Sequence, residues 1–297
     1  MWEPTPVADQ VLELVHTPAH VEAIRQVSSR GGHIDADTVV SHGSWEAALR
    51  SVGALVEAVD AVSDRRMDNA FCAVRPPGHH ATPDQAMGFC LFNNVAIAAE
   101  WLIRQRRAQR VAILDYDVHH GNGTQDAFDT RTDVLYVSTH QYPLYPGTGH
   151  WRETGAGYTM NISLPPGSGD QVISAALPQL IEPAVRRYAP EFILVSLGFD
   201  AFWNDPLANL RFSVSGAYNA LLRSACDLAA ELCDGRIVVA LEGGYDLDAL
   251  AHGTDATCRL LLGEEPAPDP IGGPPEELSA SEVQPLLTAI GELHRVD

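Results

Sequence analysis

The sequence predicts a single-domain α/β protein in which helices cover both faces of a parallel β-sheet. Six short apolar segments alternate along the chain with longer Ala- and Leu-rich segments of helical period, a rhythm typical of a parallel sheet. Several of the short segments are apolar on both faces, as buried parallel strands are. Strands are therefore expected at residues 70–74, 110–117, 134–140, 158–164, 192–199 and 236–244.

Helical periodicity predicts the elements between these strands. The expected helices cover residues 43–62, 93–105, 172–188 and 215–233. The one clear change in composition comes late, where residues 264–278 are rich in Pro, Gly and acidic side chains. We therefore divide the chain into a main domain of residues 1–263, a connector of residues 264–278, and residues 279–297, whose helix packs on the same domain.

Composition limits the classes of partner. The 297 residues include 19 Lys and Arg against 39 Asp and Glu, a formal net charge of -20, which disfavours general binding to nucleic acid or an anionic membrane surface. The five cysteines have neither CxxC spacing nor a paired framework. Neither a signal peptide nor a membrane-spanning stretch is recognisable. These features predict a cytoplasmic protein with reduced thiols.

Polar clusters follow five of the six predicted strands. "RPPGHH" comes after the first strand, "DYDVHHG" the second, "STHQYPLYPGTGH" the third, "GFDAFWND" the fifth and "EGGYD" the sixth. Open α/β sheets bind ligands beyond the carboxyl ends of their strands. The five segments are therefore expected to converge on one crevice.

The segment "DYDVHHGNG" predicts a metal site. If the strand continues in extended form, its period of two places Asp115, Asp117 and His119 on one face. Asp200, at the end of another strand, completes an Asp, His, Asp ligand set with Asp117 and His119. Such a set suits zinc or iron(II), so the ligand set has two interpretations, a catalytic zinc site or the facial triad of iron oxygenases.

Acid/base groups favour the zinc reading. Adjacent His79 and His80 can flank one metal-activated water, one removing its proton and one protonating a leaving group. Asp115 and Asn122 are candidates to orient the two imidazoles. Tyr245, after two glycines, can polarise a carbonyl with its phenol.

These residues carry a family resemblance. "RPPGHHA", "GFCLFNN", "DYDVHHGNGTQDAF", "STHQ", "YPGTG", "GFDAFWNDPL" and "LEGGYD" occur in this order between about His16 and Leu262. This series resembles the histone deacetylase family, with its bacterial relatives the acetylpolyamine amidohydrolases and acetoin-utilisation proteins, and within it the class II-like deacetylases of bacteria and archaea. The resemblance implies the arginase/deacetylase α/β sandwich. Compared with the family pattern, the chain is short ahead of "VHTPAHVEAI".

The resemblance implies a role for each matching residue. It implies that Asp117, His119 and Asp200 bind zinc and that His79 and His80 are the acid/base pair. It further implies that Asp115 orients His79, that Asn122 orients His80 and that Tyr245 binds the substrate carbonyl. Asn122 follows the class II pattern, whereas class I members carry Asp there, so His80 is expected to hold a proton less readily.

A narrow acyl-lysine tunnel is also implied by the resemblance. Phe89 and Tyr145 would face each other across the alkyl chain, with Gly88 alongside and Asp37 at the rim binding a peptide backbone. In the family a potassium ion lies behind the strand. Asp115 and Ser138 match its side-chain ligands.

Function is therefore expected to be zinc-dependent removal of acetyl groups from lysine side chains or small amines. Leu207 stands where polyamine-selective branches carry an acidic gatekeeper, which favours acyl-lysine over a polycationic substrate. Acetylpolyamine hydrolysis and a non-catalytic acyl-binding module are the alternatives. Iron(II) is the alternative metal.

Overall fold

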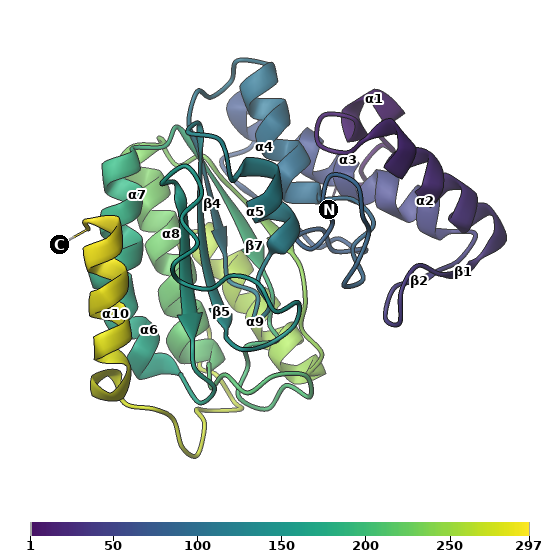
Figure 1. Ribbon diagram of the computed structural model, residues 1–297. Helices are drawn as coiled ribbons and strands as arrows, with labels where there is room; N and C mark the ends of the chain where they lie inside the picture. The colour runs from purple at the N-terminus through teal and green to yellow at the C-terminus, as the bar shows by residue number, and fades with distance from the viewer. Residues whose placement is uncertain (1, 297) are drawn as a thin grey trace.

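One parallel sheet organises the molecule (Figure 1). The computed structural model describes residues 2–296. The main sheet has six strands in the order β3-β8-β7-β4-β5-β6, and each neighbouring pair is parallel. These strands are β3 Ala70–Cys72, β4 Val111–Asp115, β5 Val134–Gln141, β6 Thr159–Leu164, β7 Phe192–Leu197 and β8 Ile237–Leu241. The predicted parallel sheet and its six strands are confirmed.

Helices connect and cover these strands. They are α1 Asp9–Leu12, α2 Pro18–Arg30, α3 Ser44–Ser63, α4 Asn94–Arg104, α5 Asn122–Phe128, α6 Asp170–Ala176, α7 Glu182–Tyr188, α8 Asn219–Leu232, α9 Leu247–Leu261 and α10 Ala280–His294, with π-helical turns η1 Leu177–Ile181 and η2 Val214–Tyr218. The predicted helix 172–188 is the continuous run α6-η1-α7. Pro178 lies in η1, and because proline has no N–H to donate, the regular α-helical pattern is interrupted there.

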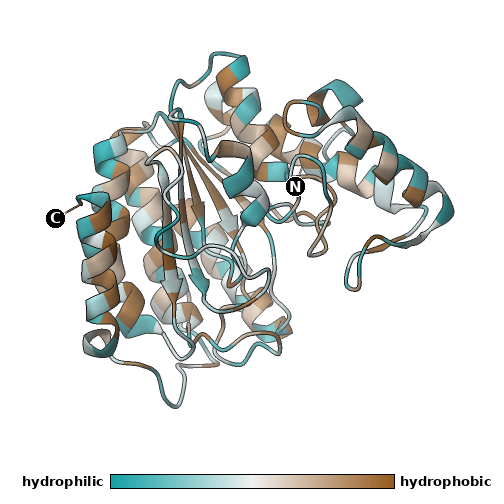
Figure 2. Cartoon of the chain, viewed as in Figure 1, coloured by the Kyte–Doolittle hydropathy of each residue, from teal (hydrophilic) through white to brown (hydrophobic). Residues whose placement is uncertain are grey.

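Alternation along the strands sends apolar side chains to both faces of the sheet. In β4, Val111 and Ile113 join the core beneath α3 and α4, whereas Ala112 and Leu114 join the core beneath α6 to α10. Figure 2 shows the strands as mainly hydrophobic and the helices as divided between hydrophobic and hydrophilic faces. The expected sandwich of helix, sheet and helix is therefore confirmed.

Residues 2–43 form elements that the sequence patterns did not predict. α1 and α2 lead into a short antiparallel ribbon of β1 Gly32–His33 and β2 Val39–Val40. Apolar side chains such as Leu12, Ile24 and Phe92 pack this segment against α3 and α4 in a separate core cluster. This part of the chain lies beside the main sheet in Figure 1.

The last helix packs against the main body of the fold. α10 contacts α6, η1 and β6, and its Val283, Leu287 and Ile290 are buried in the larger core. Its start is fixed by a capping box between Ser279 and Glu282. The division of the chain at residues 263 and 279 stays a prediction. Among residues 2–296, each helix is too short or too polar to cross a membrane.

One local prediction is wrong. β4 ends at Asp115 and does not continue as an extended strand through His119. The side chain of Asp115 accepts a hydrogen bond from the N–H of Asp117, and that of Asp117 accepts one from the N–H of His119. These two Asx-type contacts turn the chain away from the sheet. They, and not strand alternation, bring Asp117 and His119 together.

Candidate functional site

The polar segments meet in a cavity of about 220 Å³ at the carboxyl ends of the strands. Five loops, those after β3, β4, β5, β7 and β8, contribute to its wall, as does the β1–β2 ribbon. The lining residues are Asp37, Pro77, His79, His80, Gly88, Phe89, Asp117, His119, Leu144, Tyr145, Asp200, Leu207, Gly243 and Tyr245. The predicted convergence of five segments on one crevice is therefore confirmed.

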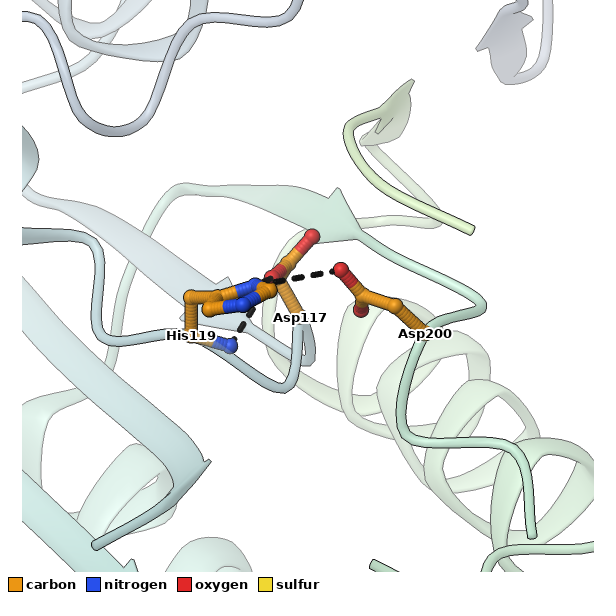
Figure 3. A group of neighbouring side chains, drawn as sticks. All are labelled: Asp117, His119 and Asp200. Atoms are coloured by element: carbon orange, nitrogen blue, oxygen red, sulfur yellow. Dashed lines mark hydrogen bonds and ion pairs between the residues drawn. The ribbon is translucent and has the colours of Figure 1, made fainter. Parts of the chain in front are cut away.

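Asp117, His119 and Asp200 form the polar centre of this cavity (Figure 3). One potential ligand atom of each residue lies within 4.8 Å of the others. His119 Nδ1 is 3.1 Å from Asp117 Oδ1 and 3.2 Å from Asp200 Oδ2. Asp117 and Asp200 are each only 1% exposed. The three side chains thus present oxygen and nitrogen atoms to one small volume.

Two buried carboxylates lie side by side in this cluster, with the His119 imidazole between them. Among the described residues, Asp200 Oδ2 is buried and accepts no hydrogen bond of regular geometry, although His119 Nδ1 lies 3.2 Å away. Burial and the neighbouring Asp117 carboxylate raise the pKa of Asp200 to about 6. Burial alone would raise the pKa of Asp117, but the imidazoles of His79 and His119 lower it. Two buried carboxylates this close repel each other, and a bound cation would relieve that repulsion.

Backbone groups hold the two carboxylates in place. Val118 N–H donates to Asp200 Oδ1 at 3.0 Å, and Gly243 N–H donates to Asp117 Oδ2 at 2.9 Å. A Cβ atom at Gly243 would lie 2.2 Å from Asp200 Oδ2. Glycine is therefore required there, because the loop after β8 approaches the cluster too closely for a side chain.

The adjacent imidazoles of His79 and His80 lie beside the cluster. Their ring centroids are 4.0 Å apart, and both side chains are buried. His79 Nδ1 is 3.1 Å from Asp115 Oδ2, and His80 Nδ1 is 2.9 Å from Asn122 Oδ1. Since each Nδ1 faces an oxygen acceptor, each carries its proton there and leaves Nε2 as the second ring nitrogen. These are the pairings that the sequence predicted.

The two imidazoles have opposite electrostatic surroundings. Burial lowers the pKa of His79, but the carboxylates of Asp115, Asp117 and Glu242 outweigh it and raise the pKa to about 10. Burial and the neighbouring His79 hold the pKa of His80 well below its usual value. Two titratable groups with pKa values pushed apart are typical of acid/base sites. The hydrogen bond with Asn122 itself acts to raise the pKa of His80, so the effect expected of Asn122 stays a prediction.

Tyr245 contributes a phenol to the same cavity. Its ring centroid lies 6.1 Å from that of Phe89, and its backbone N–H donates to Asp205 Oδ2 at 2.9 Å. Burial, together with Asp200 and Asp117, raises the pKa of the phenol. Tyr245 therefore stays protonated and able to donate a hydrogen bond.

The predicted tunnel residues all line the cavity. Gly88 and Phe89 have φ angles of +55° and +67°, and a Cβ atom at Gly88 would lie 2.4 Å from His80 Cδ2. The Tyr145 ring lines the cavity, and its centroid is 5.2 Å from that of the His80 ring. Leu207 is 48% exposed at the mouth. Glycine is therefore required at position 88, because the backbone there lies in direct contact with the His80 imidazole.

Asp115 and Ser138 face each other across β4 and β5 as register partners. Ser138 Oγ lies 2.8 Å from His140 Nδ1, whose other nitrogen Nε2 donates to the carbonyl of Gly149. The Ser138 hydroxyl therefore donates to His140 and keeps its lone pairs available as acceptors. The potassium site proposed for Asp115 and Ser138 stays a prediction.

Four further residues support the site and were not identified in the sequence. They are Asp35, Tyr136, Asp205 and Glu242. Asp35 accepts from the N–H of Asp37, and Tyr136 donates to Asp115. Asp205 and Glu242 had a signal in the sequence, because they lie within the "GFDAFWNDPL" and "LEGGYD" motifs. The partners of Tyr136, Asp205 and Glu242 are distant in sequence, so local patterns do not reveal them.

Comparisons with known proteins agree with this geometry. The family profile described as "Histone deacetylase domain" matches residues 1–261. A "Probable deacetylase" of Archaeoglobus fulgidus is 45% identical over 81% of this chain and 67% of its own length. A "Histone deacetylase-like amidohydrolase" of Pseudomonas aeruginosa is 40% identical over 81% of this chain and 64% of its own.

A plant relative and a solved structure extend the match. "Histone deacetylase 10, chloroplastic" of Oryza sativa is 41% identical over 85% of this chain. The chain spans only 60% of that relative's length. The crystal structure of the HDA15 HD domain matches with a TM-score of 0.82 and 36% identity, covering 89% of this chain and 77% of that one. The shared fold, the motif series and these identities show that this chain belongs to the histone deacetylase family.

Proposed function

We propose that this protein is a zinc-dependent amidohydrolase that removes acetyl groups from lysine side chains or related amines. The observation that carries the proposal is the meeting of the Asp117, His119 and Asp200 cluster with the His79–His80 pair and Tyr245 in one cavity. Membership of the histone deacetylase family supports the same reaction class. Relatives named as deacetylases and as an amidohydrolase add to that support.

Zinc fits the donor set. Two carboxylates and one imidazole make three protein ligands, the number that catalytic zinc sites use with an open fourth position. Asp200 Oδ2, buried and without a hydrogen bond of regular geometry, is available as a ligand atom. When bound, zinc would polarise the substrate carbonyl and lower the pKa of the attacking water. Iron(II) accepts the same ligands, so metal identity is part of the test below.

The side chains supply the remaining chemistry. The Tyr245 phenol, kept protonated by burial, donates to the carbonyl oxygen and stabilises negative charge that develops there. The His79–His80 pair accepts a proton from water and returns a proton to the departing amine nitrogen. Asp115 and Asn122 fix the tautomers by accepting from the two Nδ1 atoms. The products are acetate and a free amine.

The entrance favours an acyl-lysine substrate. Leu207 and Tyr145 are partly exposed side chains that line the cavity, and Leu207 offers no charge to pair with the second cation of an acetylated polyamine. Asp37, between the two strands of the β1–β2 ribbon, also lines the cavity and could accept a hydrogen bond from a peptide backbone. We therefore rank acetyl-lysine peptides above acetylpolyamines as substrates, and an acyl-binding module without turnover third.

Acetate release tests the proposal. Zinc-loaded and iron(II)-loaded protein should each be assayed with an acetyl-lysine peptide and an acetylated polyamine. Tyr245→Phe is expected to lower kcat at least about 100-fold, the usual loss when one oxyanion donor is removed. Tyr158→Phe is the matched control, because Tyr158 is a 36% exposed tyrosine that packs on Tyr188, outside the cavity.

The outcomes separate the candidates. Turnover of the peptide that requires Tyr245 supports the proposal, and faster turnover of the polyamine would select the second candidate. Absence of turnover with a full equivalent of metal bound, together with saturable peptide binding, would select the acyl-binding module.

A further inference from the structure

Glu242 is a buried carboxylate that the reaction described above does not use. It follows β8 directly and is 1% exposed. It lies three residues before Tyr245 in the loop after β8. Burial raises its pKa, while His79 and the backbone of Gly78 lower it. Such a group is costly to bury without partners, so its contacts identify its role.

The Glu242 carboxylate binds the backbone of the histidine segment. Oε2 accepts hydrogen bonds from the N–H of Gly78 at 2.6 Å and from the N–H of His79 at 3.2 Å. Oε1 accepts one from Ser196 Oγ on β7 at 2.9 Å. The carboxylate therefore ties the loop after β3 to the end of β7, although Glu242 and Gly78 are 164 residues apart in sequence.

A second hydrogen bond joins the loop after β3 to the loop after β8. Arg75 Nη1 donates to the backbone carbonyl of Glu242 at 2.9 Å. On its other side, the carbonyl of His79 accepts from the N–H groups of Gly123 and Thr124 at the start of α5. The peptide units around His79 are thus held from both sides, by Glu242 at the N–H and by α5 at the carbonyl.

We propose that Glu242 is a positioning residue that sets the separation between the His79–His80 pair and Tyr245. The length of the Glu242 side chain sets this separation, because one side chain must contact both the Gly78–His79 backbone and Ser196. The inference rests on the proposed hydrolase function. It adds a residue that does not touch substrate or metal but holds two groups that do.

Two variants distinguish the effect of side-chain length at position 242 from the effect of charge. Glu242→Asp keeps the charge but shortens the side chain by about one bond, ~1.5 Å, so it cannot span Gly78 and Ser196. Glu242→Gln keeps the length, and its amide oxygen can still accept from the backbone N–H groups while its amide nitrogen donates to Ser196. We expect Glu242→Asp to lower kcat about 100-fold, the typical cost of a ~1 Å misplacement. Glu242→Gln should lower it less than about fivefold.

The controls identify a purely structural effect. KM should stay within about twofold in both variants and zinc content should stay at one per chain, because the Glu242 carboxylate hydrogen-bonds to Gly78, His79 and Ser196 and not to Gly88, Phe89, Tyr145 or the predicted metal ligands. Glu100→Asp is the matched substitution of another buried carboxylate, 3% exposed on α4 and paired with Arg131. It should leave kcat unchanged.

Amide hydrogen exchange gives a readout that needs no turnover. The Gly78 and His79 amides should be strongly protected in the unaltered protein and in Glu242→Gln, and should exchange at least tenfold faster in Glu242→Asp. Normal kcat in Glu242→Asp, equal losses in both variants, or unprotected amides in the unaltered protein would each overturn the inference. Lack of turnover by the unaltered protein would overturn the proposed function alone, since the exchange measurement would still decide the role of Glu242.

Discussion

At the scale of single residues, Asp200 gives the sharpest test of metal binding. Its Oδ2 is buried without a hydrogen bond of regular geometry, so Asp200→Asn removes both a ligand oxygen and the charge that favours a cation. Elemental analysis after dialysis should show zinc falling from about one per chain to well below that. Asp255→Asn should keep full zinc, because Asp255 is an exposed partner of Arg259 on α9. Retention of a full equivalent by Asp200→Asn would reject the predicted ligand set.

Gly88 carries a second prediction at this scale. A Cβ atom there would lie 2.4 Å from His80 Cδ2, and the residue has a φ of +55°. Gly88→Ala should therefore displace His80 and lower kcat about 100-fold, besides costing about 1 kcal/mol of backbone strain.

A matched glycine separates the two effects. Gly263 has a φ of +72° and nothing within 4 Å of a built Cβ atom, so Gly263→Ala carries the backbone strain without the clash. It should lower the unfolding midpoint slightly and leave kcat unchanged. Equal activity of the two variants in steady-state kinetics would show that His80 tolerates a methyl group beside it.

At the scale of elements, His16 joins the segment between α1 and α2 to the start of α4. Its Nδ1 donates to the carbonyl of Thr82 at 2.9 Å, and its Nε2 accepts from the N–H of Asn93 at 2.8 Å. Only a neutral ring can make both contacts. Burial and the neighbouring His20 accordingly lower the pKa of His16 to about 3.

This contact predicts a pH dependence of stability. Between about pH 6.5 and 3 the unfolded chain binds a proton at His16 and the folded chain does not, so the free energy of unfolding falls as pH falls. The slope from one such histidine is at most about 1.4 kcal/mol per pH unit. Urea unfolding at several pH values should show a shallower slope for His16→Gln than for the unaltered protein. The exposed His33→Gln should leave the slope unchanged, and identical slopes for all three proteins would refute the prediction.

α10 provides the other test at this scale. Leu287 is fully buried against the main core, whereas Leu293 on the same helix is 43% exposed. Leu287→Ala should lower the free energy of unfolding by about 2–5 kcal/mol, and Leu293→Ala by less than about 0.5 kcal/mol. Denaturant unfolding would measure both. A small loss at Leu287 would indicate that residues 279–297 do not belong to the same cooperative unit.

At the scale of the whole molecule, strand order decides which loops meet. β3 and β8 are the first and last strands of the main sheet along the chain, yet they are neighbours in the sheet, where β8 lies between β3 and β7. This arrangement places the loops that carry His79, Asp200 and Tyr245 on neighbouring strand ends. Because all six strands of the main sheet are parallel, their carboxyl ends share one edge, and the polar segments collect there.

Much of this arrangement could be predicted locally. The strand at 192–199 and the helix at 43–62 are visible because apolar periodicity acts over a few residues. Asp117 and His119 were identified as neighbours although the predicted reason, a continued strand, is wrong. Their spacing of two satisfies both an extended strand and the Asx-type turns that the chain adopts, so the pattern could not distinguish the two.

The sequence by itself determined the fold class, the family motifs and the chemistry of the site, because these depend on residue type and short spacing. Only the tertiary structure decided which side chains support that site. Glu242 reaches Gly78, and Asp205 holds the N–H of Tyr245, through contacts between loops far apart in the chain. Such contacts depend on the order and register of parallel strands, which no local pattern encodes. The surroundings of Asp200 Oδ2 belong to the same class, since whether a buried oxygen accepts a hydrogen bond of regular geometry depends on everything packed around it.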